Sequence, residues 1–294
     1  MPENKSLRID TCQLLGYPKR IEIELSSSCN LQCVYCPRRF FNNLNGFLDL
    51  GAFKKIVDES AVYPETVIVL HRRGESLLHP NFIEICEYIR GKFKEIQLAT
   101  NATLLDEGKN RAIIDSIHFI SFSIDVPSVF NKTRIPAKYS DVQKRILHFL
   151  DMNGGRVKTQ VSMVKTEITP NENLQIFKKL WRKKVDRVRI YEEHSKDGRF
   201  GSLKCNRGRR LPCVMPFYEL LICSDGKVRR CNHDWDGFAM GDVNKNSLKE
   251  IWNSSIYAEL RKQHSCMNIY DEVCRNCDSW YAEIGNQGTG ETIK

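Results

Sequence analysis

Short apolar runs alternate, along the first two thirds of the chain, with longer segments in which apolar residues recur every three or four positions. The run Ile21–Leu25 alternates apolar and polar residues with the two-residue period of a half-buried strand. Such runs predict strands at Ile21–Leu25, Thr66–His71, Glu95–Thr100, His118–Ile124, Lys158–Val164 and Arg187–Tyr191. The segments between them predict amphipathic helices at Asp49–Ser60, Asn81–Lys92, Glu107–Ser116, Tyr139–Met152 and Asn171–Lys184.

This alternation of strands and helices predicts an α/β fold with a parallel sheet and helices on its outer face. Six strands are too few for a complete eight-stranded barrel. We therefore expect a partial (β/α)6 barrel, open on one side, over residues 19–192. In such folds the residues at the carboxyl ends of the strands line the active site.

A second, smaller domain is predicted after the barrel. Residues 193–212 are rich in glycine and charge and predict a linker. Weak alternation in Phe217–Ile222, a turn at Ser224–Lys227 and the returning run Val228–Cys231 predict a hairpin, and the apolar spacing predicts one helix from Ser247 to His264. We expect this small domain over residues 213–280, an N-terminal extension over 1–18 and a tail over 281–294.

Composition narrows the function classes. No apolar run approaches the roughly 18 residues of a membrane span, and the charged N-terminus lacks the apolar stretch of a secretion signal. The 12 cysteines therefore indicate metal binding in a reducing cytoplasm, not disulfides. The net charge of +9 is spread along the chain and not gathered in a stripe, so we expect neither a nucleic-acid nor a membrane partner.

Three of the cysteines, Cys29, Cys33 and Cys36, follow the first strand with the spacing C-x3-C-x2-C. No fourth ligand is evident in this loop, as a structural zinc site would need. Three thiolates suit a [4Fe–4S] cluster with one open iron, to which a small molecule can bind. A zinc knuckle or three incidental thiols are the alternatives.

This spacing resembles that of the radical SAM superfamily. The resemblance implies that S-adenosylmethionine (SAM) binds the open iron and is cleaved to a 5′-deoxyadenosyl radical, with an external electron donor such as flavodoxin or ferredoxin. It places Tyr35 beside the adenine. Gly74 and Glu75 are similar to the family's Gly-Gly-Glu-Pro, which holds the methionine amine, although Arg73 replaces one glycine and Ser76 the proline.

Polar residues at the next two strand ends extend the same resemblance. Asn101, in a Thr-Asn-Ala-Thr segment, and Ser123, in Ser-Ile-Asp, are similar to family positions that bind SAM. Asp125 and Arg134 are expected to face either SAM or the substrate. Capping of turns is an equal alternative for Asp125.

The C-terminal cysteines Cys213, Cys231, Cys274 and Cys277 make a complete four-thiolate set that suits either zinc or an iron–sulfur cluster. Their spacing, with Gly226 between the first two, resembles the SPASM/twitch extension of radical SAM enzymes. Because no cysteine follows Cys277, the short twitch form with one auxiliary [4Fe–4S] cluster is implied. The layout is similar to that of the butirosin-pathway dehydrogenase acting on 2-deoxy-scyllo-inosamine.

We therefore expect an enzyme that removes hydrogen from a polar small molecule, such as an aminocyclitol, amino sugar or nucleoside, with oxidation or epimerisation as the outcome. Cys205, Cys223 and Cys266 are candidate hydrogen donors for epimerisation, with structural thiols as the alternative. Modification of a ribosomally made peptide is the second hypothesis. Only 18 residues precede Lys19, which leaves no leader-recognition domain and favours the small molecule. A non-enzymatic iron–sulfur or zinc module is the alternative of another class.

Overall fold

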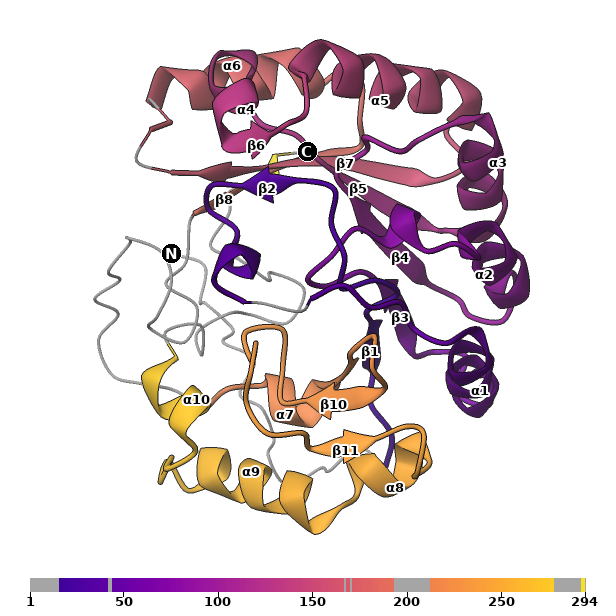
Figure 1. The fold of residues 1–294 in the computed structure, drawn as a ribbon, viewed down its shortest axis with the longest axis vertical. Coiled ribbons are helices and arrows are strands. Elements are labelled where there is room, and N and C mark those ends of the chain that lie inside the picture. Colours follow the sequence, from indigo (N-terminus) through magenta and orange to yellow (C-terminus); the bar gives the residue numbers. More distant parts are fainter. Residues whose placement is uncertain are drawn as a thin grey trace, which may run out of the picture.

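The computed structural model describes residues 16–41, 44–166, 168–169, 171–192, 212–277 and 292–293. One sheet with the strand order β11-β10-β9-β1-β3-β4-β5-β7-β8-β12 organises this part of the chain (Figure 1). Its central six strands are all parallel, in sequence order, and form the partial barrel. These are β1 (Arg20–Ile23), β3 (Val67–Leu70), β4 (Ile96–Thr100), β5 (Phe119–Ser123), β7 (Lys158–Lys165) and β8 (Arg187–Glu192). The expected strands and the α/β partial barrel are thus confirmed.

The two faces of this sheet differ in polarity because side chains alternate along each strand. One face carries Ile21, Ile23, Leu70, Ile120 and Val161, all buried in the apolar core against the helices. These helices are α1 (Leu50–Ala61), α2 (Phe82–Ile89), α3 (Glu107–Ser116), α5 (Tyr139–Asn153) and α6 (Asn171–Trp181). Figure 1 shows α1, α2, α3 and α5 along the outer side of the sheet. The opposite, inner face is mostly polar.

Helix starts follow from local sequence. Asp49 and Asp106 accept hydrogen bonds from the backbone NH groups of Ala52 and Lys109, which caps α1 and α3. At the other end of α5, Gly154 takes the left-handed conformation, with φ of 54°, that terminates many helices. These caps fix where α1 and α3 begin and where α5 ends.

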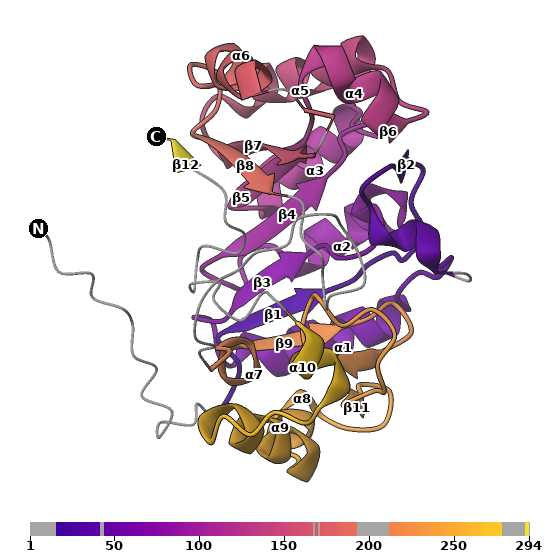
Figure 2. The ribbon, with the colours of Figure 1, turned by 90° about the vertical axis from the view of Figure 1, so that its left-hand side faces the viewer.

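The C-terminal hairpin continues the barrel sheet and does not form a separate one. β9 (Glu219–Ile222) pairs in parallel with β1, and β10 (Lys227–Arg229) returns antiparallel beside it to meet β11 (Gly241–Asp242). Arg20 of β1 forms an ion pair with Glu219 of β9, at 3.0 Å. The first strand and a strand from the C-terminal third of the chain are therefore neighbours in one sheet (Figure 2).

The single helix expected from Ser247 to His264 is wrong, because the structure has two helices there. α8 (Leu248–Trp252) begins with a capping box formed by Ser247 and Glu250. α9 (Ser255–Ser265) begins where Ser254 accepts a hydrogen bond from the NH of Tyr257. A second cap signal inside the apolar pattern thus interrupts the helix.

Several short elements lie outside the expected pattern. β2 (Gln32–Cys33) pairs antiparallel with β6 (Arg134–Ile135), which follows α4 (Pro127–Thr133). Two 3-10 turns, η1 (Pro37–Phe40) and η2 (Ser76–Leu78), and the helices α7 (Met215–Tyr218) and α10 (Glu272–Asn276) complete the main elements. β12 (Thr292–Ile293), within the expected tail, pairs with β8. Among the described residues no helix is long and apolar enough to cross a membrane.

Candidate active site

The N-terminal cysteines lie on the loop that leaves the carboxyl end of β1. Cys29, Cys33 and Cys36 are all half-buried, and Cys33 belongs to β2. Burial raises the pKa of Cys33 to about 12 and also raises the pKa of Cys29, while neighbouring thiols add to both effects. The three sulfurs thus lie within each other's electrostatic reach. In the metal-free chain burial keeps Cys29 and Cys33 protonated, so binding a cluster would release their protons.

Amide groups surround the first of these sulfurs. The backbone NH of Leu31 lies 3.5 Å from Cys29 Sγ and the side-chain amide of Asn101 lies 3.9 Å from it. Asn101 also donates to Asn30 and accepts from the backbone NH of Thr103, so its orientation is fixed. N–H groups directed at cluster sulfurs are the kind of contact that tunes an iron–sulfur centre. The donor set therefore fits a three-cysteine cluster.

Gly74 allows two loops to approach closely. A Cβ atom there would lie 2.2 Å from the carbonyl oxygen of Ser26 and 2.3 Å from that of Ser28. The next residue, Glu75, donates its backbone NH to the Ser28 carbonyl at 2.8 Å. Only glycine lets the strand-end loop after β3 pack on the backbone that leads into Cys29.

The carboxylate of Glu75 joins that loop to the one after β4. It accepts hydrogen bonds from the hydroxyl of Thr100 at 2.7 Å, from the NH of Asn101 at 2.7 Å and from the NH of Leu77 at 3.1 Å. The side chain is buried, and this burial raises its pKa despite the three donors. In this structure Glu75 positions Asn101, and its expected contact with SAM remains a prediction.

Asp125 is the centre of a second polar group beside the cysteine loop. It accepts hydrogen bonds from Tyr35 at 3.0 Å and Thr133 at 2.7 Å, and forms a two-point ion pair with Arg134 at 3.1 and 3.2 Å. The Arg134 guanidinium lies over the Tyr35 ring, 5.5 Å from its centroid. Asp125 and Arg134 neutralise each other in a buried position, and together they fix Tyr35 within the cysteine loop.

The inner face of β5, β7 and β8 carries two polar rows. Directly paired residues of a parallel sheet share a face, and here they are Ser121, Gln160 and Arg187 in one row and Ser123, Ser162 and Arg189 in the next. Gln160 donates to Ser121 at 2.7 Å and accepts from Arg187. The row that contains Ser123 and Arg189 is closer to the carboxyl ends of the strands. It lies at the level of the loops that hold Asn101 and Asp125.

The four C-terminal cysteines come from three places around the hairpin. Cys213 precedes α7, Cys231 follows β10, and Cys274 and Cys277 lie in and just after α10. Burial is the main reason that the pKa of Cys231 is raised, and the charges of the other three thiols raise this pKa further. The four thiols are thus close enough to act on one another electrostatically, and their binding of one cluster stays a prediction. In the described chain no three His, Cys, Asp or Glu side chains stand close enough to hold one metal ion, whereas each cysteine of a cluster binds a different iron.

Arg230 connects the segments that carry the C-terminal cysteines. Its guanidinium contacts Asp234 at 2.8 Å and Asp271 at 2.7 Å. Asp271 also caps α10 by accepting a hydrogen bond from the NH of Cys274. Arg230 is adjacent to Cys231 in the chain, so one side chain ties the hairpin that carries Cys231 to the helix that carries Cys274.

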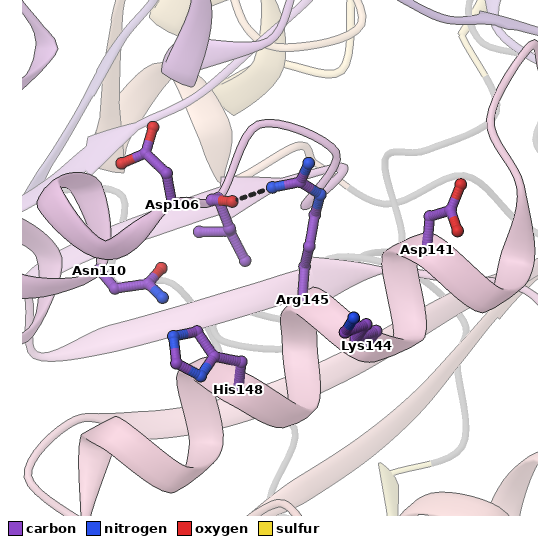
Figure 3. A pocket seen from close by; sticks show the side chains of 7 residues that line it. Asp106, Asn110, Asp141, Lys144, Arg145 and His148 are labelled. Carbon is purple, nitrogen blue, oxygen red and sulfur yellow. Dashed lines mark hydrogen bonds between the residues drawn. The ribbon is translucent and has the colours of Figure 1, made fainter.

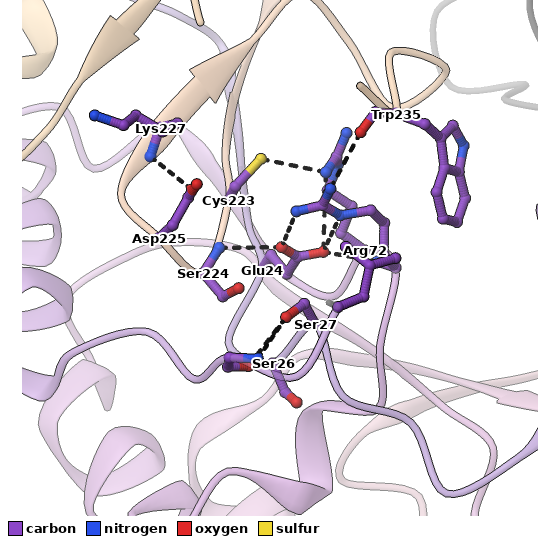
Figure 4. Close-up of polar contacts among 12 residues, drawn as sticks. Glu24, Ser26, Ser27, Arg72, Cys223, Ser224, Asp225, Lys227 and Trp235 are labelled. Atoms are coloured by element: carbon purple, nitrogen blue, oxygen red, sulfur yellow. Dashed lines mark hydrogen bonds and ion pairs between the residues drawn. The ribbon is translucent and has the colours of Figure 1, made fainter. Parts of the chain in front are cut away.

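A buried ionic network, which sequence reasoning did not identify, joins the two cysteine regions (Figure 4). Glu24, just after β1, accepts from Arg73 at 2.6 and 2.7 Å and from the NH of Ser224 at 3.0 Å. Arg72 lies 3.2 Å from the Cys223 sulfur and donates to the carbonyl of Asp234. The sequence signal for this network is the alternation of glutamates, Glu22 and Glu24, with apolar residues in and just after β1.

The three candidate hydrogen donors differ in burial and in position. Cys223 has no exposed surface and contacts Arg72, and burial raises its pKa. Cys266 is exposed at the C-terminal end of α9, on the outside of the C-terminal region. Cys205, like most of the expected linker 193–212, lies outside the described residues.

A cavity of about 410 Å³ lies on the outer side of the barrel, between α3 and α5 (Figure 3). Arg145 crosses it to donate to the carbonyl of Leu105, and Asp106 at its rim caps α3. Its walls are formed by Leu105, Asp106, Asn110, Asp141, Lys144, Arg145 and His148. None of these residues belongs to the cysteine sites or to the polar rows, so the cavity is separate from the candidate active site.

Comparison with known proteins supports both cysteine sites. Residues 23–180 match the model of the radical SAM superfamily, and residues 213–278 match the SPASM iron–sulfur cluster-binding domain. The second match favours an auxiliary cluster over structural zinc. The tungsten-containing aldehyde ferredoxin oxidoreductase cofactor-modifying protein of Pyrococcus furiosus is 28% identical over 110 residues. That alignment covers 37% of this chain and 31% of the relative's length, so the chain matches under a third of it.

Two solved structures share the fold. BtrN, in complex with AdoMet and 2-DOIA, has a TM-score of 0.61 at 18% identity over 88% of this chain and 92% of that one. SuiB of Streptococcus suis, bound to its precursor peptide SuiA, has a TM-score of 0.69 at 13% identity over 92% of this chain and 73% of that one. The radical SAM match covers more than half of the 294 residues. Together with the geometry of the cysteine loop, it shows that the chain belongs to the radical SAM superfamily and carries a C-terminal SPASM domain.

Proposed function

We propose that this radical SAM enzyme oxidises a polar small molecule, such as an aminocyclitol, an amino sugar or a nucleoside, at an unactivated C–H bond. The observation that carries the proposal is the pair of polar rows on the inner face of β5, β7 and β8. Serine hydroxyls and a buried guanidinium near the carboxyl ends of these strands suit hydroxyl-rich or amino-substituted substrates. An apolar substrate would form no hydrogen bonds with these polar side chains.

The residues of the chain have distinct roles in this proposal. When bound, the N-terminal cluster and SAM supply the radical that removes a hydrogen atom. Arg189 and Ser162 hold polar groups of the substrate, and Glu75 fixes the loop that carries Asn101. Asp125 and Arg134 hold Tyr35, and with it the end of the cysteine loop, in place. These side chains orient the substrate and exclude water, and the cofactors provide the difficult chemistry.

Oxidation is favoured over epimerisation by the positions of the described thiols. A thiol that returns hydrogen must touch the substrate, but Cys223 is buried against Arg72 and Cys266 lies on the outside of α9. The four-cysteine auxiliary site leaves no iron open for the substrate. Its role in the proposal is to take the second electron of the oxidation.

Turnover in deuterium oxide tests this function. The reconstituted enzyme is incubated with SAM, reductant and a panel of aminocyclitols, amino sugars and nucleosides. We expect 5′-deoxyadenosine together with a product two mass units lighter than the substrate and free of deuterium. A redox-neutral product with one solvent deuterium, lost in Cys205→Ala, Cys223→Ala or Cys266→Ala, would instead establish an epimerase.

The polar rows give a sharper test of the substrate class. Arg189→Met should raise KM for the substrate at least tenfold while SAM cleavage without substrate is unchanged. Lys158→Met is the matched control, because Lys158 lies on the neighbouring strand but its side chain is 72% exposed. Unchanged KM in Arg189→Met would remove the substrate-binding role of this row.

Modification of a peptide is the second candidate, and the likeness to SuiB with its bound precursor peptide favours it. The backbone amides of a peptide are also polar and would suit the same inner face. The two candidates are separated by which substrate accelerates 5′-deoxyadenosine formation. Stimulation by peptides encoded near the gene, with none from the small-molecule panel, would replace the first proposal with the second.

A further inference from the structure

Three buried charged side chains lie next to the C-terminal cysteines, and their charges do not cancel. Arg230 contacts Asp234 at 2.8 Å and Asp271 at 2.7 Å. The side chains of Arg230, Asp234 and Asp271 are 3%, 0% and 8% exposed. One guanidinium faces two carboxylates, so this group carries one excess negative charge. Burial limits the screening of that charge by water and salt.

Asp271 brings a carboxylate of this group to one of the cysteines. One of its oxygens accepts a hydrogen bond from the backbone NH of Cys274 at 3.2 Å, as the N-cap of α10. The other oxygen accepts from Nε of Arg230. The backbone NH of Asp271 donates to the side chain of Gln263 at 2.9 Å. The position of the Asp271 carboxylate relative to Cys274 is therefore fixed by three separate contacts.

Charges on the two adjoining elements are exposed or have partners of their own. Glu272 and Arg275 of α10 have opposite charges and are both exposed. Arg72 reaches the group from the barrel and donates to the backbone carbonyl of Asp234. Its guanidinium also lies 3.9 Å from the carboxylate of Glu24. These charges therefore leave the excess negative charge beside Cys274 in place.

We propose that the Asp271 carboxylate lowers the reduction potential of the auxiliary cluster, and that Arg230 holds this carboxylate in position. A fixed negative charge opposes the arrival of an electron and thus favours the oxidised cluster. A single charge roughly 12 Å away, at an effective dielectric constant of about 20, changes the ratio of reduced to oxidised cluster about tenfold. This inference rests on the proposed function, because it concerns the electron acceptor of the oxidation.

The reduction potential is measured on the reconstituted full chain by a redox titration followed by electron paramagnetic resonance. SAM changes the signal of the N-terminal cluster, to which it binds, and so identifies the signal of the auxiliary cluster. Asp271→Asn removes the charge and keeps an N-cap acceptor for Cys274. We expect it to raise the ratio of reduced to oxidised auxiliary cluster about tenfold at a given applied potential, a shift of about 59 mV for one electron.

Two further variants separate the charge of Asp271 from a structural role. Asp271→Glu keeps the negative charge and should keep the ratio within about threefold of that in the unaltered protein. Glu272→Gln removes a neighbouring exposed charge and should change the ratio less than about twofold, because solvent screens that charge. An unchanged ratio in Asp271→Asn, or an equal change in Glu272→Gln, would overturn the inference.

If Asp271→Asn loses iron, Asp271→Ser is measured in the same way, because serine also caps a helix and carries no charge. An unchanged potential in Asp271→Ser, or loss of iron from both variants, would overturn the inference as well. Absence of a second cluster signal in the unaltered protein would do the same. Failure of the proposed function is distinct, since the titration contains no substrate and does not depend on the product.

Discussion

The two cysteine sites occupy neighbouring strands of one sheet but differ in how the chain encloses them. The N-terminal site has three thiols on a loop after β1, bordered by amides, by the polar inner face and by the paired strands β2 and β6. The C-terminal site has four thiols between a hairpin and α10, braced by Arg230. Three thiols would leave one iron of a cluster open for a ligand, whereas four thiols would leave none open. The two sites thus differ both in the number of cysteines and in the elements that surround them.

A single buried network connects these unlike sites. Glu24 follows β1 directly and precedes the loop that carries Cys29. Its partner Arg73 belongs to the barrel, and its partner Ser224 belongs to the C-terminal region. The hairpin of the SPASM domain is also part of the same sheet as the barrel strands. Each prediction below perturbs one side of this comparison, or the link between them.

Removal of the N-terminal ligands should have the largest effect. The variant Cys29→Ala, Cys33→Ala, Cys36→Ala should form no 5′-deoxyadenosine, because no open iron remains for SAM. It should keep about four irons per chain, those of the auxiliary cluster. Iron analysis and chromatography of the nucleoside check both statements. Cys266→Ala, a thiol outside both sites, should be unaffected, and residual SAM cleavage in the triple variant would contradict the assignment.

Loss of the auxiliary site should separate SAM cleavage from product formation. Cys231→Ala removes one of the four ligands, so iron should fall from about eight to about four per chain. SAM cleavage should continue while the oxidised product is lost, since its electron acceptor is gone. Iron content unchanged in Cys231→Ala, or a zinc signal in the unaltered protein, would refute a second cluster ligated by these four cysteines.

Breaking the link between the sites should lower stability strongly. Glu24→Gln leaves Arg72 and Arg73 buried without their carboxylate, at a cost of about 3–5 kcal/mol in the free energy of unfolding. Urea denaturation measures this value. The control Glu84→Gln breaks an exposed pair with Lys54 and should cost about 0–1 kcal/mol. Equal effects in the two variants would mean that the network does not hold the regions together.

The same glutamate should give a defined dependence on pH. Burial opposes its ionisation, but the hydrogen bonds and charges of Arg73 and Arg72 lower the pKa of Glu24 overall. Its contribution to stability is therefore complete above the ordinary glutamate pKa of about 4.3 and is lost as pH falls toward the lower folded value. Glu24→Gln should remove this part of the acid dependence. The free energy of unfolding, measured from about pH 3 to about pH 6, would show the difference.

A smaller effect is expected from Gly74→Ala. The added methyl group meets two backbone carbonyl oxygens that cannot move alone, which costs about 1–3 kcal/mol and shifts the loop before Cys29. SAM affinity should fall while the auxiliary cluster is retained. Gly16→Ala is the matched control, since nothing lies within 4 Å of a Cβ there. Unchanged SAM affinity in Gly74→Ala would show that the close approach of the loops is dispensable.

The smallest effect is expected from Tyr35→Phe. This change removes one hydrogen bond to Asp125, which still has Thr133 and Arg134 as donors, so a loss of about 1 kcal/mol in SAM binding is expected. Equilibrium binding of SAM to the reconstituted protein measures it. A loss as large as that from Gly74→Ala would mean that the Tyr35 hydroxyl contacts SAM directly.

The sequence alone determined the barrel, and it predicted the two cysteine ligand sets. Short apolar runs and the amphipathic segments between them are local signals, so the six strands and five helices appear within a few residues of their predicted bounds. Cysteine spacing is local as well, and it predicted Cys29, Cys33 and Cys36 as the ligands of the first cluster. The split between α8 and α9 was missed because the apolar pattern runs through Ser254, although its cap signal is present in the sequence.

Only the tertiary structure decided how distant segments meet. The pairing of β2 with β6 joins residues about a hundred positions apart, and that of β9 with β1 joins residues about two hundred apart. No local periodicity encodes such partners, because they are chosen by burial and hydrogen bonding across the whole fold. For the same reason Glu24 looked like one polar residue of an alternating strand. Its role appeared only when folding buried it between Arg73 and Ser224, where an uncompensated charge would not be stable.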